Sequence, residues 1–193
     1  MRTLIALRKI GIYGGTFSPI HHGHLILARE ALERLHLDEV RFVTAALSPD
    51  KDKSLRADCR LEMVEAAIAD EPGFVADDIE LKRPPPSYSI DTVRQLRERM
   101  PDARFFWLVG ADHVGDLPTW KEFRELDRLV QFVVLDRGDG APPNCYPTVK
   151  RKIDMSGSEI RKRVAAGESI RYFVPPAVEE IIRTRALYKE QDK

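Results

Sequence analysis

One stretch near the N-terminus indicates the fold of this chain: residues 14–25, which read GGTFSPIHHGHL. The apolar run at 10–13 before it is typical of a buried strand, and Leu25, Ala28 and Leu32 after it recur at helical spacing. A glycine-rich turn between a strand and a helix lies at the carboxyl end of the strand. Ligands bind at that end of open parallel sheets, so we expect residues 14–25 to belong to the functional site.

The same alternation of strands and helices continues along the chain. We expect further strands at 40–46, 104–109 and 132–135, and helices at 22–36, 60–70 and 90–100. In the 60–70 helix the buried stripe is predicted to be Leu61, Val64 and Ile68. The sequence therefore predicts an α/β fold: a single Rossmann-like, doubly wound parallel sheet with helices on both faces and C-terminal helices.

Local signals place the remaining elements. Capping boxes at Thr119 with Glu122 and at Ser156 with Glu159 predict two helix starts. C-terminal helices are expected at about 156–166 and 176–186. The proline- and glycine-rich segment 137–147 is expected to be a surface loop, because too little chain follows it to fold alone. We therefore expect one domain over residues 1–193.

Composition and charge exclude several classes of function. The 193 residues, 22.0 kDa, carry 31 basic and 31 acidic side chains, so the net charge is zero and the pI is about 7. Nucleic-acid-binding domains typically have a pI above about 9, so no nucleic acid partner is expected. No apolar run approaches the roughly 18 residues of a membrane span, and the first residues lack the apolar stretch of a signal peptide. We expect a cytoplasmic protein that does not bind membranes.

The residues of the 14–25 stretch suit a phosphate group. Gly14 and Gly15 let the backbone approach a phosphate closely, and the free amides of a helix N-terminus favour an anion. His21 and His24, three positions apart, point from one face of the first helical turn. A metal cluster and a structural cap are the alternatives, although the neighbouring sequence offers no further metal ligand at suitable spacing. The predicted metal-ligand set is therefore empty.

A second phosphate site is indicated at residues 155–163, MSGSEIRKR. The hydroxyls of Ser156 and Ser158 lie at a helix N-terminus, and Arg161 follows one turn in, which suits a polyphosphate. A capped, basic surface helix is the alternative interpretation.

Four further features carry weaker signals. The prolines at 84–86 stiffen a loop that delivers a helix start near Ser89, and Trp120 is expected at the first position of the helix predicted from the capping box. A core role is the alternative for Trp120. Asp112 follows the predicted central strand, where an aspartate typically meets a ribose hydroxyl. Arg137 faces a ligand or is an exposed loop residue.

These motifs resemble those of the nucleotidyltransferases that carry the signature H-x-G-H, here residues 21–24. Within that family the sequence is most similar to the bacterial nicotinate-nucleotide adenylyltransferases, from about residue 10 to 188. The segment 155–163 is similar to their I-S-S-T-x-I-R, and 78–92 is similar to their D-I-E-L…P-S-Y-T-x-D-T. Their G-x-D and R-x-G motifs match residues 110–112 and the pair that begins at Arg137.

The resemblance implies a nucleotidyltransferase domain and a role for each matching residue. His21, His24 and Arg161 would be catalytic, with Ser156, Ser158 and Arg161 on the β- and γ-phosphates of ATP. Asp112 would contact a ribose and Arg137 the adenine. The remaining ATP-binding residues would be Gly14, Gly15, Thr16, Phe17, Gly23 and Gly110.

The resemblance also implies a nicotinate pocket. It would be formed by Ser87, Tyr88, Ser89, Trp120 and Lys121, with the amides of Ser89 and Lys121 facing the carboxylate and the indole stacked on the pyridine ring. Lys51 would steer phosphate to the site.

The sequence departs from the family pattern at three places. The family has Asp at position 18, where this chain has Ser18, and Ser-Thr at 157–158, where it has Gly-Ser. It has P-P-H-K at 48–51, where Asp50 stands in place of His and would repel phosphate if it pointed inward.

The activity implied is transfer of AMP from ATP to nicotinate mononucleotide, giving deamido-NAD and pyrophosphate. Mg²⁺ is expected to accompany ATP, ligated mostly by phosphate and water. The alternatives are adenylyl transfer to nicotinamide mononucleotide or to phosphopantetheine, or a non-catalytic nucleotide-binding regulator.

Overall fold

A six-stranded sheet forms the centre of the computed structural model, which describes residues 7–46, 55–138 and 145–189. Its strand order is β3-β2-β1-β4-β5-β6, and every pair is parallel. The strands are β1 (Arg8–Gly15), β2 (Glu39–Thr44), β3 (Phe74–Asp77), β4 (Ala103–Gly110), β5 (Gln131–Asp136) and β6 (Thr148–Lys150).

Helices connect the strands on both sides of the sheet. They are α1 (His22–Arg34), α2 (Ala57–Ile68), α3 (Ser89–Arg99), α4 (Phe123–Leu129), α5 (Gly157–Ala165) and α6 (Pro176–Thr184), with a 3₁₀ helix η1 (Ala111–Thr119). In the described part of the chain, no helix has both the length and the apolar composition needed to cross a membrane.

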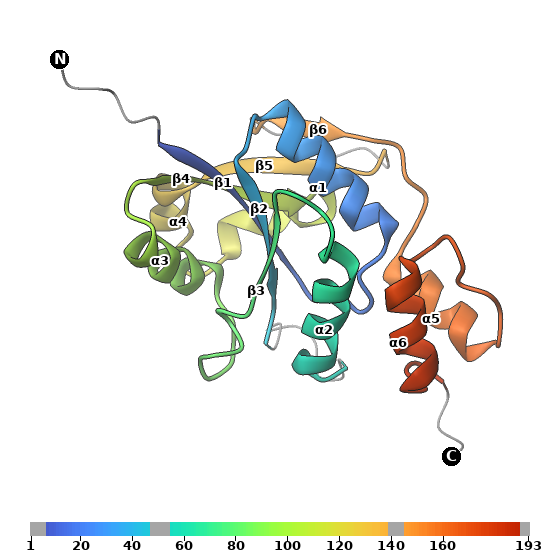
Figure 1. Cartoon of the computed structure of the whole chain (residues 1–193). Helices are drawn as coiled ribbons and strands as arrows, with labels where there is room; N and C mark the ends of the chain where they lie inside the picture. The colour runs from blue at the N-terminus through green and yellow to red at the C-terminus, as the bar shows by residue number, and fades with distance from the viewer. Residues whose placement is uncertain (1–6, 47–54, 139–144, 190–193) are drawn as a thin grey trace.

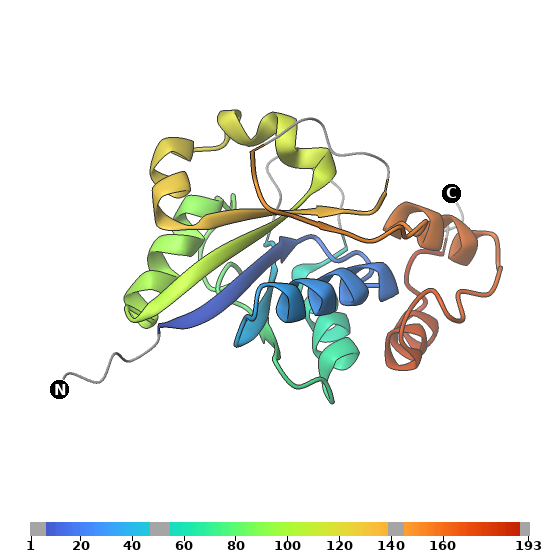
Figure 2. The same cartoon turned by 90° about the horizontal axis from the view of Figure 1, so that it is seen from above.

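The sheet separates two apolar cores. One core joins α1, α2 and α6 to the sheet through residues such as Leu27, Val64 and Ile182. The other joins α3, η1 and α4 through residues such as Val93 and Leu126. Figures 1 and 2 show α1 and α2 on one face and α3 and α4 on the other, with α5 and α6 together beyond the start of α1. The predicted doubly wound fold is confirmed.

The strands and helices expected from periodicity form within a few residues of their predicted bounds. The expected start of α5 is confirmed, because the hydroxyl of Ser156 accepts a hydrogen bond from the backbone amide of Glu159 at 3.2 Å. The edge strands β3 and β6 were not predicted. They have four and three residues, too few to display a period.

The helix start predicted at Thr119 is wrong. The segment before it forms η1, and the Thr119 hydroxyl donates to the carbonyl of Asp116 at 2.7 Å instead of accepting from an amide. Glu122 has a left-handed backbone, with φ 51°, and α4 begins only at Phe123. The 3₁₀ helix η1 ends at Thr119, and the α-helix begins three residues later than the capping-box pattern predicted.

Candidate active site

A cavity of about 630 Å³ opens at the carboxyl ends of β1 and β4. These two strands are neighbours at the centre of the sheet, and the chain leaves them toward opposite faces, which creates a crevice. Nine of the predicted site residues line this cavity: Gly14, Gly15, Thr16, Ser87, Tyr88, Ser89, Gly110, Trp120 and Lys121. Sequence reasoning missed Glu80, Trp107, His113, Asp116 and Thr119, which also line it.

Both tryptophans of the chain form one wall of the cavity. Trp120 packs edge-on against Trp107, with ring centroids 6.2 Å apart and planes at 83°. Trp107 is buried, whereas Trp120 is half-buried and presents part of its ring to the cavity. Its position was predicted wrongly: Trp120 directly follows η1 and has an extended backbone, and its amide donates to the carbonyl of Leu117, so it is not a free helix-start amide.

The two histidines lie at the start of α1. His21 precedes the first helical residue and His24 is in the first turn, and their ring centroids are 3.8 Å apart. A Cβ at position 23 would lie 3.0 Å from the His21 ring, so a glycine there leaves room for the imidazole. Nδ1 of His24 accepts from the backbone amide of His21 at 3.3 Å, which assigns the proton of the neutral ring to Nε2.

Burial holds both histidines in their neutral forms. Burial, together with a smaller effect of the Arg137 guanidinium, lowers the pKa of His21 from 6.5 to about 4. Burial, His21 and Arg137 in turn hold the pKa of His24 well below its ordinary value. A neutral imidazole donates through one N–H, so the pair offers hydrogen bonds, and an arriving anion would favour its protonation.

The N-terminus of α5 is docked onto the loop between β1 and α1 (Figure 2). Arg161 donates to the carbonyl of Ser18 at 2.7 Å and to the hydroxyl of Ser158 at 3.1 Å. A Cβ at Gly157 would lie 3.2 Å from that same carbonyl. Two of the departures from the family pattern, at positions 18 and 157, therefore face each other.

Three arginines surround this loop without a carboxylate partner among the described residues: Arg60, Arg137 and Arg161. Arg137 donates to the carbonyl of Met155 at 3.2 Å. Arg60 is 1% exposed and donates to the carbonyls of Thr16, Ala45, Ala46 and Leu55. A guanidinium stays charged even when buried, so these groups leave positive charge for a ligand to neutralise.

Arg60 was missed because Leu61 was predicted on the buried stripe of α2. That prediction is wrong: the buried residues are Arg60, Met63, Val64 and Ile68, and Leu61 is only half-buried. The signal in the sequence is an arginine four positions before Val64, on the apolar side of a helix.

The remaining predicted residues are placed less directly. The side chain of Phe17 is buried against Tyr13 and His24 and does not line the cavity. The Asp112 side chain is exposed and does not line the cavity. Lys51, next to the altered residue Asp50, lies outside the described residues.

Comparison with known proteins agrees with this architecture. The sequence profile of the cytidylyltransferase-like family matches residues 12–163. A protein of Shouchella clausii named "Probable nicotinate-nucleotide adenylyltransferase" is 44% identical over 97% of this chain and 100% of its own length. A protein of the same name from Thermus thermophilus is 41% identical over 94% of this chain and its full length.

The fold is also found among solved structures. That of Plasmodium falciparum nicotinic acid mononucleotide adenylyltransferase complexed with NaAD has a TM-score of 0.81 and 21% identity. The match covers 94% of this chain and 97% of the Plasmodium chain.

Proposed function

This chain belongs to the cytidylyltransferase-like family, and we propose that it transfers the adenylyl group of ATP to nicotinate mononucleotide, giving deamido-NAD and pyrophosphate. One observation carries the proposal: a histidine pair that Arg137 influences, next to a loop bonded by Arg60 and Arg161, adjoins the tryptophan-lined cavity. The first suits a polyphosphate and the second suits a planar ring. The proposal takes residues 1–193 as one nucleotidyltransferase domain acting in the cytoplasm, where ATP is available.

The reaction is an in-line displacement at the α-phosphorus of ATP. A 5′-phosphate oxygen of the mononucleotide forms the new P–O bond, and the bond from the α-phosphorus to the bridging oxygen of the β-phosphate breaks. The electron pair of that bond leaves with pyrophosphate. A phosphate monoester is already an anionic nucleophile near neutral pH, so the protein needs to supply positioning and charge stabilisation.

The histidine pair would stabilise the charge that builds on the transferred phosphate. Nε2–H of His24 and the ring of His21 would donate to α- and β-phosphate oxygens. Arg161 and Ser158 would hold the leaving pyrophosphate at the N-terminus of α5, and Arg137 lies close enough to act electrostatically on both histidines.

The cavity would hold the pyridine end of the acceptor. Trp120 offers a ring face, and Ser87, Tyr88 and Ser89 bring the N-terminus of α3 to the same cavity. Gly14, Gly15, Thr16, Gly23 and Gly110 would let the backbone approach the nucleotide. Asp112 and Phe17 through its backbone complete the proposed ATP contacts, and Lys51 the phosphate contacts of the acceptor.

Mg²⁺ fits this site as part of the nucleotide substrate. Within the described residues no group of three or more His, Cys, Asp or Glu side chains is placed to hold a metal ion. The side chains around the loop are imidazoles, guanidiniums and hydroxyls, which bind phosphate oxygens. Mg²⁺ held by the ATP phosphates and water would add charge neutralisation on the triphosphate.

The test is pyrophosphate release from ATP with Mg²⁺ and one of three acceptors: nicotinate mononucleotide, nicotinamide mononucleotide or phosphopantetheine. We expect the highest kcat/KM with the first. Preference for either other acceptor would contradict the substrate assignment and leave the phosphate chemistry in place. ATP binding without release with any acceptor would instead indicate a nucleotide-binding regulator.

A further inference from the structure

Lys121 is the one lysine or arginine among the described residues that line the cavity. Two carboxylates, Glu80 and Asp116, line it as well. Glu80 is occupied, because it accepts from the hydroxyl of Thr92 at 2.5 Å and lies 3.4 Å from Arg83. Asp116 adds negative charge on the η1 side. An acceptor with an anionic ring substituent therefore depends on Lys121 for an opposite charge.

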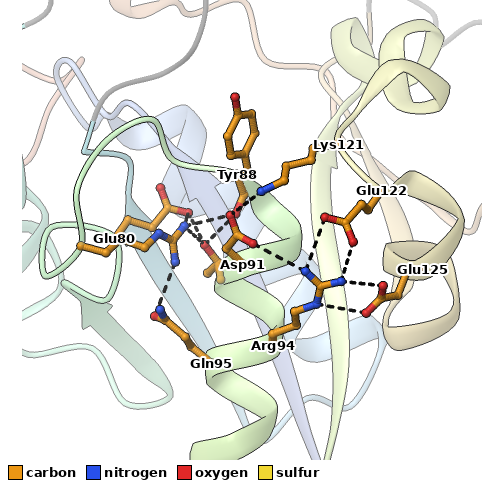
Figure 3. A network of polar contacts seen from close by, with 10 residues as sticks. Glu80, Tyr88, Asp91, Arg94, Gln95, Lys121, Glu122 and Glu125 are labelled. Atoms are coloured by element: carbon orange, nitrogen blue, oxygen red, sulfur yellow. Dashed lines mark hydrogen bonds and ion pairs between the residues drawn. The ribbon is translucent and has the colours of Figure 1, made fainter.

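The ammonium of Lys121 is held at the N-terminus of α3. Its Nζ lies 3.2 Å from Oδ2 of Asp91 and 4.5 Å from the centroid of the Tyr88 ring. Tyr88 precedes the first residue of α3 and Asp91 is in its first turn, so both partners surround Ser89. Figure 3 shows Lys121 reaching from its own segment across to these residues.

Asp91 does not use up the hydrogen-bond donors of Lys121. Its carboxylate lies 3.2 Å from Nζ of Lys121 and 3.7 Å from Arg94, which also pairs with Glu122 and Glu125. An ammonium has three donors, and Asp91 takes one of them. The other two are available to a ligand beside the first amides of α3, which a helix leaves free.

A second contact ties the segment that carries Lys121 to α3. Arg94 on α3 binds Glu122 and Glu125, each at 2.6 Å, across the gap between α3 and α4 (Figure 3). Glu122 follows Lys121 directly and has a left-handed backbone. These ion pairs of Arg94 with Glu122 and Glu125, called the clamp below, therefore keep Lys121 facing α3.

We propose that the side chain of Lys121 is a specificity-determining group that selects a pyridine carboxylate over a pyridine carboxamide. This inference rests on the proposed function and concerns the ammonium, separately from the backbone amide of the same residue. A carboxylate gains a charge-assisted hydrogen bond from Nζ and a carboxamide does not, while both rings fill the same cavity.

The test compares two ligands that differ only in this group. For the wild type, Lys121→Met and Lys121→Arg, Kd values for nicotinate and nicotinamide mononucleotide are measured by calorimetry, and kcat/KM values with ATP. We expect Lys121→Met to lower the preference for the carboxylate about tenfold, the scale of one charge-assisted contact at a partly exposed site. Lys121→Arg should keep the preference. The matched control is Lys82→Met. It removes an ammonium that lies 2.7 Å from a carboxylate oxygen of Asp78 and does not line the cavity.

A purely structural role for Lys121 would weaken both ligands equally and leave their ratio unchanged, which would overturn the inference. An equal loss of preference in Lys121→Arg or Lys82→Met would overturn it too, because a local ammonium–carboxylate contact would not be the cause. The binding arm needs no turnover. Absence of adenylyl transfer by the wild type would contradict the proposed function, while the Kd ratio would still decide on Lys121.

Discussion

The two halves of the candidate site treat charge in opposite ways. Around the loop between β1 and α1, the histidines are neutral and the arginines Arg60, Arg137 and Arg161 bind backbone carbonyls. Around the cavity, the side chains of α3 and α4 pair with one another, as Arg94 does with Glu122 and Glu125. One half leaves its arginines without acidic partners among the described residues, and in the other most arginines and lysines pair with carboxylates.

This difference separates chemistry from selection. A group of cations without acidic partners stabilises a bound polyanion strongly. It stabilises the transition state more still, because negative charge grows there. A surface whose ion pairs are already made gains little from a charged ligand and discriminates by shape and by single contacts. Substitutions in the first half should therefore reduce turnover strongly, and those in the second should alter KM or selectivity modestly.

The largest effect is expected for His24→Ala. The variant loses a donor to the transferred phosphate, and kcat should fall by about 10²-fold or more, the usual loss for one transition-state donor. Steady-state pyrophosphate release measures it, with folding checked by thermal denaturation. His36→Asn, in the exposed turn after α1, is the control and should keep turnover. Near-normal kcat in His24→Ala would remove this residue from the chemistry.

The neutral state of His21 should appear in the pH dependence of stability. Its folded pKa is about 4 against 6.5 when unfolded, so between these values the unfolded state binds the extra proton. The free energy of unfolding should thus fall as the pH drops from 6.5 to 4, by about 3 kcal/mol from this residue at 1.36 kcal/mol per unit.

Urea denaturation of the wild type and His21→Gln at pH 7 and pH 4 isolates that contribution, because the other titrating groups are common to both. The variant should lose about 3 kcal/mol less than the wild type. An equal change in the free energy of unfolding between pH 7 and pH 4 for the two proteins would show that His21 is not held neutral. With ATP bound the dependence should weaken, since the phosphates favour the protonated ring.

The order of the sheet and the contacts around the loop could be anticipated from sequence to different extents. Buried strands of six to eight residues, such as β1, β4 and β5, show long apolar runs, and their alternation with amphipathic helices defines the doubly wound topology. Short edge strands have no such signature. The segment after β4 was misread because a capping-box pattern records which residues are present and not which way a hydroxyl points.

The candidate site was predictable where residues are close in sequence. His21 and His24 are three positions apart at the start of α1, so their spacing predicts that both rings lie on one face. The docking of Arg161 on Ser18 spans 143 positions, and no local pattern encodes it. Arg60 shows the opposite case. Helical periodicity puts it on the same face as Val64 and Ile68, but the apolar Leu61 was predicted for the buried face instead.

A smaller effect is expected at the cavity wall. Trp120→Ala removes a half-buried ring that faces the cavity, and KM for the mononucleotide should rise about tenfold while kcat changes little, as for the loss of one stacking contact. Tyr172→Asn, which removes an exposed aromatic side chain on the segment before α6, is the matched control. A fall in kcat as large as that of His24→Ala would contradict the separation of the two halves.

The smallest effect is expected for Arg94→Gln. Its pairs with Glu122 and Glu125 are partly exposed, and such contacts are weakened by water and salt. Because the clamp positions the segment of Trp120 and Lys121, KM for the mononucleotide should rise about twofold at low ionic strength. The difference from the wild type should vanish at about 1 M salt, where the Debye length is only about 3 Å.

Arg183→Gln, which breaks a similar pair with Glu180 on α6, should leave KM unchanged at either ionic strength. A change in kcat that persists at high salt would instead make Arg94 part of the chemistry, and the two halves of the site would then act as one.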